Sequence, residues 1–138
     1  MTPAVSLHRP LIAVVDDESP IRVALRRLLH SAGFLVETYE SGAEFLESVG
    51  TRLPDCVVLD LHMPRVSGFA VQAALAERGL RLPVVIVTGH DDAASRERAL
   101  AGGAAAYLRK PVDDEALLHA IASAVAPVRT EAGGGDQS

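Results

Sequence analysis

The sequence predicts an α/β fold in which five parallel strands form one sheet with helices on both faces. Short apolar runs alternate with segments of helical periodicity five times along the 138 residues. Alternation of this kind is typical of a parallel sheet with right-handed crossovers. Most of the runs lack polar alternation, which suits strands that are covered on both faces.

The expected strands are five short segments. Four are apolar runs, of which the alanine-rich last one is the weakest, and one alternates apolar and polar residues. In chain order they are Leu11–Val15, the alternating Phe34–Tyr39, Cys56–Leu59, Pro83–Val87 and Ala104–Leu108.

Each expected strand is followed by a helical pattern with start and stop signals. In the first, Ser19 supplies a cap, Pro20 fills the first turn and Gly33 ends the helix. The remaining four patterns begin at Ser41, at Ser67, at Asp91 or Asp92, and at Asp113.

The composition indicates a single globular domain. Hydrophobic residues make up 49% of the chain and charged residues 22%, which allows a substantial core. We expect a folded domain over residues 10–126, an N-terminal extension over 1–9 and a disordered tail over 127–138, whose Gly-Gly-Gly segment offers nothing to bury.

Charge and hydropathy exclude several classes of protein. The net charge is −5 and the 13 basic residues are scattered, so we expect no direct nucleic-acid binding. One cysteine, Cys56, cannot form an intramolecular disulfide. No apolar stretch approaches the ~20 residues of a membrane span, and the N-terminus does not resemble a signal peptide. We expect a cytoplasmic protein without membrane contact.

Polar residues follow the apolar runs where the strands end. They are Asp16-Asp17-Glu18, Asp60, Thr88 and Lys110. In open parallel sheets the carboxyl ends of the strands share one edge, where ligands bind. Clustered carboxylates raise each other's pKa values, and a divalent cation relieves their repulsion. Hard oxygen ligands favour Mg²⁺, with Mn²⁺ also possible.

The same set of groups suits phosphoryl transfer. A carboxylate such as Asp60 attacks, while a metal ion and Lys110 neutralise charge on the phosphoryl oxygens and Thr88 donates a hydrogen bond. Each residue alone has a simpler interpretation, because acidic residues are common in the first turn of a helix. Structural needs do not explain why all these strand ends carry complementary polar groups.

The motifs resemble those of the receiver domain of two-component response regulators, over about residues 10–126. They are Val14-Val15-Asp16-Asp17-Glu18, Leu59-Asp60-Leu61-His62-Met63-Pro64 with Gly68, Val87-Thr88-Gly89-His90 and Tyr107-Leu108-Arg109-Lys110-Pro111. Among such receivers, the motifs resemble most those of nitrogen-fixation and LuxR-type regulators. The resemblance implies a flavodoxin-like, doubly wound (βα)5 fold.

The resemblance also assigns roles around the phosphoacceptor. Asp60 would receive the phosphoryl group, and Lys110 would pair with it. Asp17 and Asp60 would bind the metal directly, Asp16 would bind it through a water, and the backbone carbonyl of His62 would complete the protein ligands. These assignments make the protein a switch that acts as a catalyst only toward itself.

Further roles follow from the same resemblance. Thr88 and Tyr107 would move together as a switch when the acceptor is phosphorylated. The mouth of the pocket would be lined by His62, Gly89 and His90, which would modulate the phosphoryl lifetime. A simpler interpretation of the two histidines is that they are solvated loop residues. The bond between Lys110 and Pro111 would be cis.

The expected function is that of a single-domain response regulator. A histidine kinase or histidine phosphotransfer protein would phosphorylate it, and it would then change its affinity for an unknown protein effector, as a monomer or a weak phosphorylation-dependent homodimer. One alternative is the receiver fragment of a longer DNA-binding regulator. Another is a magnesium-dependent phosphohydrolase with an aspartate nucleophile, which is disfavoured because His62 occupies the position of its second acid.

Overall fold

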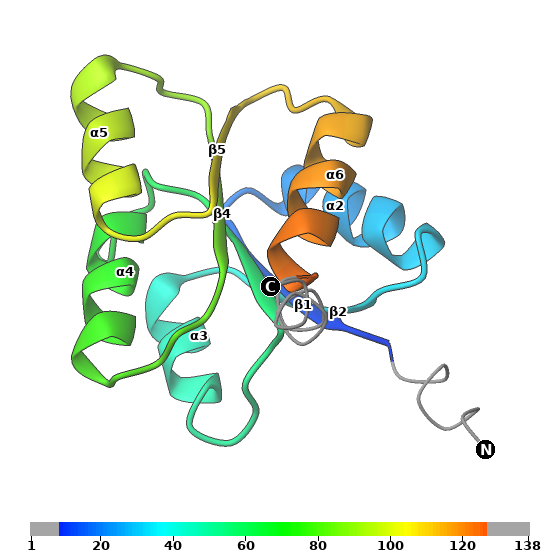
Figure 1. Cartoon of the computed structure of the whole chain (residues 1–138), viewed down its shortest axis with the longest axis horizontal. Coiled ribbons are helices and arrows are strands. Elements are labelled where there is room, and N and C mark those ends of the chain that lie inside the picture. Colours follow the sequence, from blue (N-terminus) through cyan, green and yellow to red (C-terminus); the bar gives the residue numbers. More distant parts are fainter. Residues whose placement is uncertain (1–8, 127–138) are drawn as a thin grey trace, which may run out of the picture.

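The computed structural model describes residues 9–126, which form one five-stranded parallel sheet with helices on both faces (Figure 1). The strand order is β2-β1-β3-β4-β5. The predicted doubly wound α/β fold is therefore confirmed. The expected extension over residues 1–9 falls, apart from Arg9, outside the described residues, as does the whole tail over 127–138.

The strands agree closely with the sequence. They are β1 Leu11–Val15, β2 Leu35–Tyr39, β3 Cys56–Leu59, β4 Val84–Thr88 and β5 Ala106–Arg109. The first and third match the expected bounds. The expected start of β5 at Ala104 is wrong by two residues, because Ala104 still bonds back to the preceding helix through the Ala99 carbonyl oxygen.

The pairing of β1 with β3 places two acidic residues side by side. Val15 is in register with Leu59, and the Asp60 N–H donates to the Val15 carbonyl at 3.0 Å. The strand order reverses here, since β2 lies on one side of β1 while β3, β4 and β5 lie on the other. Asp16 and Asp60 therefore leave the sheet at the position where open α/β sheets bind ligands.

Within residues 9–126, four of the five helices begin directly after the cap residues that the sequence indicated. The helices are α2 Ser19–Ser31, α3 Gly42–Ser48, α4 Gly68–Glu77, α5 Ala93–Ala101 and α6 Asp114–Val125. The side chains of Ser41, Ser67, Asp92 and Asp113 cap α3 to α6 by accepting a backbone N–H three residues later.

The predicted cap at Ser19 is wrong. Ser19 is already helical, and the N-cap of α2 is Glu18, whose side chain makes no capping hydrogen bond. Pro20 lies in the first turn as expected, where its missing N–H has no helical partner to lose.

The two faces of the sheet bury separate clusters. Ala13, Val15, Val57 and Leu59 face α3, α4 and α5, while the alternate residues of β1 and β3 face α2 and α6. This division follows from the two-residue period of a strand, with both faces apolar as the continuous runs predicted. The layers hold the carboxyl ends of the strands in a fixed frame.

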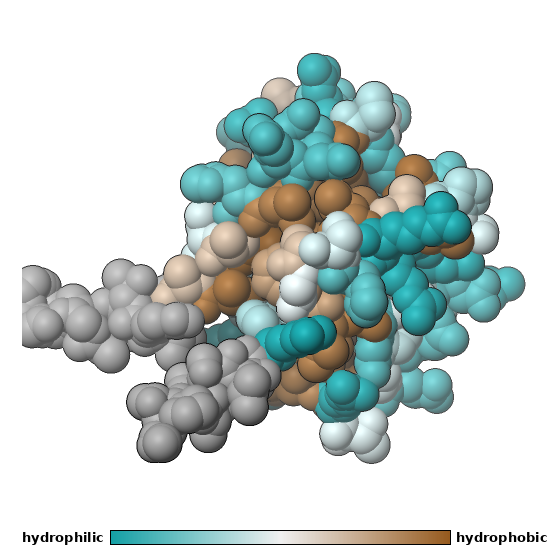
Figure 2. Space-filling view, turned by 90° about the vertical axis from the view of Figure 1, so that its right-hand side faces the viewer, coloured by the Kyte–Doolittle hydropathy of each residue, from teal (hydrophilic) through white to brown (hydrophobic). Residues whose placement is uncertain are grey.

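The side of the molecule formed by α2 and α6 exposes apolar residues across its middle, framed by hydrophilic ones (Figure 2). An apolar patch with a polar rim is typical of a protein contact surface. Within residues 9–126, no helix is long and apolar enough to cross a membrane.

We expect Asp113→Ala to lower the free energy of unfolding by about 1 kcal/mol, because the Ala116 N–H would lose its capping carboxylate at 2.9 Å. Urea unfolding followed by circular dichroism measures the change. Asp114→Ala is the matched control, since Asp114 lies in the first turn without supplying the cap. An equal loss in both variants would contradict the assigned cap.

Candidate functional site

Three carboxylates converge at the reversal of strand order. Oxygens of Asp16, Asp17 and Asp60 all lie within 4.8 Å of one another. Asp16 is 2% exposed and Asp60 4% exposed, whereas Asp17 faces solvent. The sequence predicted this meeting, and the structure brings together all three of the acidic residues expected to hold a metal.

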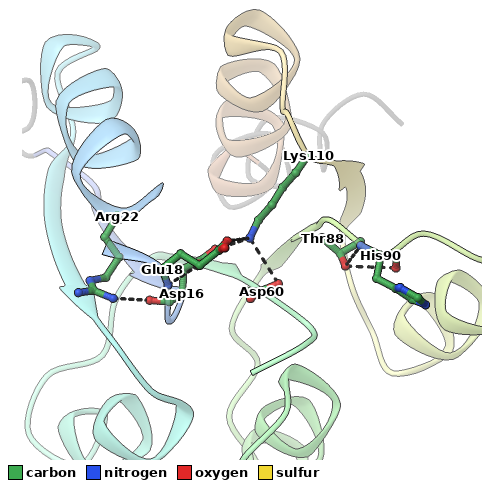
Figure 3. Close-up of polar contacts among 7 residues, drawn as sticks. All are labelled: Asp16, Glu18, Arg22, Asp60, Thr88, His90 and Lys110. Atoms are coloured by element: carbon green, nitrogen blue, oxygen red, sulfur yellow. Dashed lines mark hydrogen bonds and ion pairs between the residues drawn. The ribbon is translucent and has the colours of Figure 1, made fainter. Parts of the chain in front are cut away.

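Lys110 extends from the end of β5 into this acid cluster (Figure 3). Its Nζ lies 2.9 Å from Asp16 Oδ2 and 3.7 Å from Asp60 Oδ1. Burial lowers the pKa of Lys110, but its hydrogen bond to Asp16 and the charges of Asp60 and Asp16 outweigh this and raise the pKa. The lysine is therefore a cation held beside Asp60.

Asp60 carries a strongly perturbed carboxyl group. Its pKa is raised from 3.8 to about 6, first by burial and then by the charge of Asp16, while Lys110 and the His62 backbone N–H act in the opposite direction. Sequence reasoning attributed the effect to repulsion among carboxylates, but the removal of Asp60 from water is the larger cause.

Thr88 lies at the same edge but is turned toward its own loop. Its hydroxyl is fully buried, donates to the His90 carbonyl at 3.3 Å and accepts the His90 N–H at 3.1 Å. The next residue, Gly89, leaves room: a Cβ there would meet only Lys110, at an ordinary 3.6 Å from its Cδ. The fold itself therefore does not require glycine at this position.

The two histidines named by the sequence meet each other. The rings of His62 and His90 make an edge contact with centroids 4.9 Å apart, and His90 Nε2 lies 3.5 Å from Asp92 Oδ2. Both side chains are exposed. They lie on the loops that follow Asp60 and Thr88, in contact with solvent.

Tyr107 stands in β5 outside the acid cluster. Its ring packs under the Arg96 guanidinium, 5.6 Å from the centroid, and its buried hydroxyl makes no hydrogen bond of ordinary geometry. Burial raises the pKa of Tyr107, and the nearby Asp91 carboxylate raises it further. The Lys110–Pro111 bond is cis, as expected.

Gly68, the first residue of α4, packs closely against the backbone that follows β3. Its N–H donates to the Leu61 carbonyl at 2.9 Å. A Cβ at Gly68 would overlap the Asp60 carbonyl oxygen and lie 2.8 Å from the Leu61 Cα. Because the obstructing atoms belong to the backbone, this position requires glycine.

Sequence reasoning missed the parts that Glu18 and Arg22 play in the site. Glu18 Oε1 lies 3.2 Å from Lys110 Nζ, and Arg22 Nη1 donates to the Asp16 carbonyl at 2.8 Å. The run Asp16-Asp17-Glu18 was a signal for Glu18, but Arg22 looked like part of a solvated helix face. Its contact depends on how α2 is oriented, which periodicity alone does not give.

The donor set fits a hard divalent cation. Three carboxylates with oxygens within 4.8 Å approach the separation of ~4 Å that opposite ligands of Mg²⁺ adopt. Lys110 offsets one of the negative charges, and the cluster keeps a net negative charge when all the acids are ionised. Asp16, Asp17 and Asp60 are thus the residues that would hold the ion.

The fold and the site define a response regulator receiver. The family model of the response regulator receiver domain matches residues 12–122, so the chain belongs to that family. The transcriptional regulatory protein TdiR of Thauera aromatica is 40% identical over 115 residues, 83% of this chain and 51% of TdiR. The DNA-binding transcriptional regulator NtrC of Escherichia coli (strain K12) is 41% identical over 112 residues, 80% of this chain and 24% of NtrC.

A solved structure supports the same assignment. The response regulator receiver protein from Burkholderia phymatum is 45% identical to this chain, with a TM-score of 0.76, over 85% of this chain and 95% of that one. The chain spans about half the length of TdiR and about a quarter of NtrC.

We expect Asp60→Asn to stabilise the metal-free protein above pH 6. The raised pKa means that folded Asp60 binds more protons than the unfolded chain between pH 3.8 and about 6, so stability falls as the pH rises through that window. The neutral amide of the Asp60→Asn variant avoids this loss, which at about 1.4 kcal/mol per pKa unit amounts to about 3 kcal/mol at pH 7.

Urea unfolding in the presence of a chelator, at several pH values between 3.5 and 7, measures this difference. The free energies of unfolding of the two proteins should converge near pH 3.5. At pH 7, Mg²⁺ should reduce the difference between them. An Asp60→Asn variant that is less stable at neutral pH would contradict the burial of an unfavourable charge.

We expect Gly68→Ala to lower the free energy of unfolding by about 2–4 kcal/mol, because the new Cβ meets backbone atoms of Asp60 and Leu61. The matched control is Gly50→Ala, where a Cβ would meet only the Glu47 carbonyl oxygen, at 3.6 Å. Denaturant unfolding checks both variants, and similar stabilities would show that the loop yields easily.

Proposed function

We propose that Asp60 accepts a phosphoryl group from a histidine kinase or histidine phosphotransfer protein in a Mg²⁺-dependent reaction. The observation that carries this proposal is the convergence of two buried carboxylates, a third exposed one and a partly buried lysine at a single edge of the sheet. A site of this composition both supplies a nucleophile and neutralises the charge of the incoming group.

The chemistry follows from the charges on the described residues. An oxygen of ionised Asp60 attacks phosphorus, and the bond from phosphorus to the donor's imidazole nitrogen breaks, so that an acyl phosphate forms and the imidazole keeps the bonding electrons. With a pKa of about 6, Asp60 is largely ionised at neutral pH. Lys110 stabilises the phosphoryl oxygens, and bound Mg²⁺ would supply further positive charge.

The output step would pass through Thr88 and Tyr107. Both lie at the β4–β5 side of the sheet, next to α5, whose buried residue is the small Ala99. Movement of the Thr88 hydroxyl toward the phosphoryl group would break its bonds to His90 and allow Tyr107 to move inward. The population of one conformation would then rise at the expense of another.

The partners would be proteins. A kinase or phosphotransfer protein must reach Asp60, and the apolar patch on the α2–α6 side offers a surface for protein contact (Figure 2). We place the exchange in the cytoplasm, with the chain as a monomer or weak phosphorylation-dependent dimer that binds a protein effector. In this proposal the chain itself contacts neither nucleic acid nor membrane, and it is a switch rather than an enzyme with a separate substrate.

A second candidate is the receiver part of a longer DNA-binding regulator. It is favoured by the coverage of relatives such as NtrC, of which this chain matches 24% and which is a DNA-binding transcriptional regulator. The site would act identically in both cases, but the effector would then be a domain on the same polypeptide. Sequencing of the gene beyond the codon for Ser138 separates the two candidates.

We expect acetyl phosphate to phosphorylate the protein in the presence of Mg²⁺, with the phosphoryl group on Asp60. Intact mass spectrometry detects the added group, and peptide mapping after borohydride reduction locates it. Asp60→Asn should abolish labelling, whereas Asp114→Asn, an exposed acid on α6, should not. The histidine donor is tested separately, by transfer from a phosphorylated kinase.

Several outcomes would contradict this function. Labelling that survives in the Asp60→Asn variant would move the acceptor elsewhere, and labelling that is unchanged by a chelator would remove the metal requirement. Sustained hydrolysis of a small phosphate ester would favour the phosphohydrolase alternative.

A further inference from the structure

We propose that Glu18 is a positioning residue that holds Lys110 on the Asp16 side of the pocket and competes with the phosphoryl group for it. The inference rests on the proposed phosphoacceptor function and deepens it. It concerns the stability of the phosphorylated form. That stability depends on how easily Lys110 leaves Asp16 and Glu18 to pair with the phosphoryl group.

The resting lysine is closer to two other acids than to the acceptor. Lys110 Nζ lies 2.9 Å from Asp16 and 3.2 Å from Glu18, both within hydrogen-bond reach, but 3.7 Å from Asp60 (Figure 3). Two of its three N–H donors are thus engaged away from Asp60. A phosphoryl group on Asp60 must draw the lysine from this arrangement.

Glu18 reaches the lysine from a position that normally serves its helix. It is the N-cap of α2, yet its side chain makes no capping bond and instead contacts a residue 92 positions away. The other four helices all have a serine or aspartate side chain as cap. Serine or aspartate at position 18 would supply the capping hydrogen bond that α2 lacks, so local helix stability does not explain the glutamate.

The loop that carries Glu18 is fixed by its neighbours. The Glu18 N–H donates to Asp16 Oδ1 at 2.9 Å, while the other oxygen of the same carboxylate holds Lys110. Arg22 in turn binds the Asp16 carbonyl. Asp16 therefore joins the backbone of Glu18 and the lysine, so the glutamate carboxylate is held near Nζ although its side chain is 59% exposed.

Removal of the Glu18 carboxylate should make the phosphorylated state easier to reach. Beryllofluoride binds aspartate as a phosphoryl mimic and allows an equilibrium measurement. An exposed ion pair accounts for about 0.2–1 kcal/mol, so we expect Glu18→Gln to bind beryllofluoride about two- to fivefold more tightly. Saturating Mg²⁺ removes any change in metal affinity from the comparison, which isothermal titration calorimetry can make.

Two variants separate a direct contact from a general effect of charge. Glu18→Asp keeps the negative charge but shortens the side chain, and it adds a suitable cap. We expect it to match Glu18→Gln in beryllofluoride affinity while raising the thermal unfolding temperature. The control Glu40→Gln removes an exposed acid that follows β2 at the same edge, and it should bind as the unsubstituted protein does.

A double-mutant cycle completes the test. Glu18→Gln should have no effect in a Lys110→Met background, because the proposed action passes through the lysine. Unchanged or weaker binding by Glu18→Gln overturns the proposal, as does an equal gain in Glu40→Gln or a gain that persists without Lys110. Failure of the unsubstituted protein to bind beryllofluoride with Mg²⁺ would instead count against the phosphoacceptor function.

Discussion

The parallel register of β1 on β3 is the constraint on which the site depends. Val15 lies opposite Leu59, so the chain leaves both strands with an aspartate at the next position. A shift of either strand by one residue would turn the side chains of that strand to the opposite faces of the sheet and separate the two carboxylates. The register is held by burial on both faces of the sheet, since alternate residues of each strand enter different clusters. The core thus fixes the spacing of the acids, although none of its side chains takes part in the chemistry.

Burial of these acids opposes stability and favours function. Asp60 is removed from water, which raises its pKa to about 6 and makes the ionised form unfavourable in the metal-free fold. A cation or phosphoryl group with its counter-ions relieves that penalty, so ligand binding is coupled to folding stability. Lys110 relieves part of it at rest, but mainly through Asp16, which lies 0.8 Å closer to Nζ than Asp60 does (2.9 Å against 3.7 Å).

The sequence predicted the sheet and the meeting of its polar ends because both follow from local patterns. Apolar runs define strands, and parallel strands share one carboxyl edge. The shorter contacts of Lys110, to Asp16 and Glu18, could not be predicted, since they depend on side-chain conformations, and Glu18 is 92 positions away in the sequence. The error at Ser19 has a related cause: serine is a good cap by local preference, but the tertiary structure placed Glu18 there. The close packing of Gly68 on the Asp60 backbone likewise could not be predicted from hydrophobic periodicity.

The site joins a rigid part of the fold to a loosely anchored one. Asp60 is locked by β1, by Gly68 and by a fully apolar strand, so its backbone has little freedom. By contrast, α5 buries only the small Ala99, whose carbonyl accepts a hydrogen bond from Gln72, and two of its exposed arginines stack on Phe69 and Tyr107. Exposed cation–π contacts contribute only about 0.5–1 kcal/mol. A phosphoryl group at Asp60 would therefore change the conformation of α5 and its surroundings, because little free energy is needed to move this weakly anchored helix. Thr88 and Tyr107 lie between these two parts, and their present contacts, to His90 and Arg96, are the ones such a change would break.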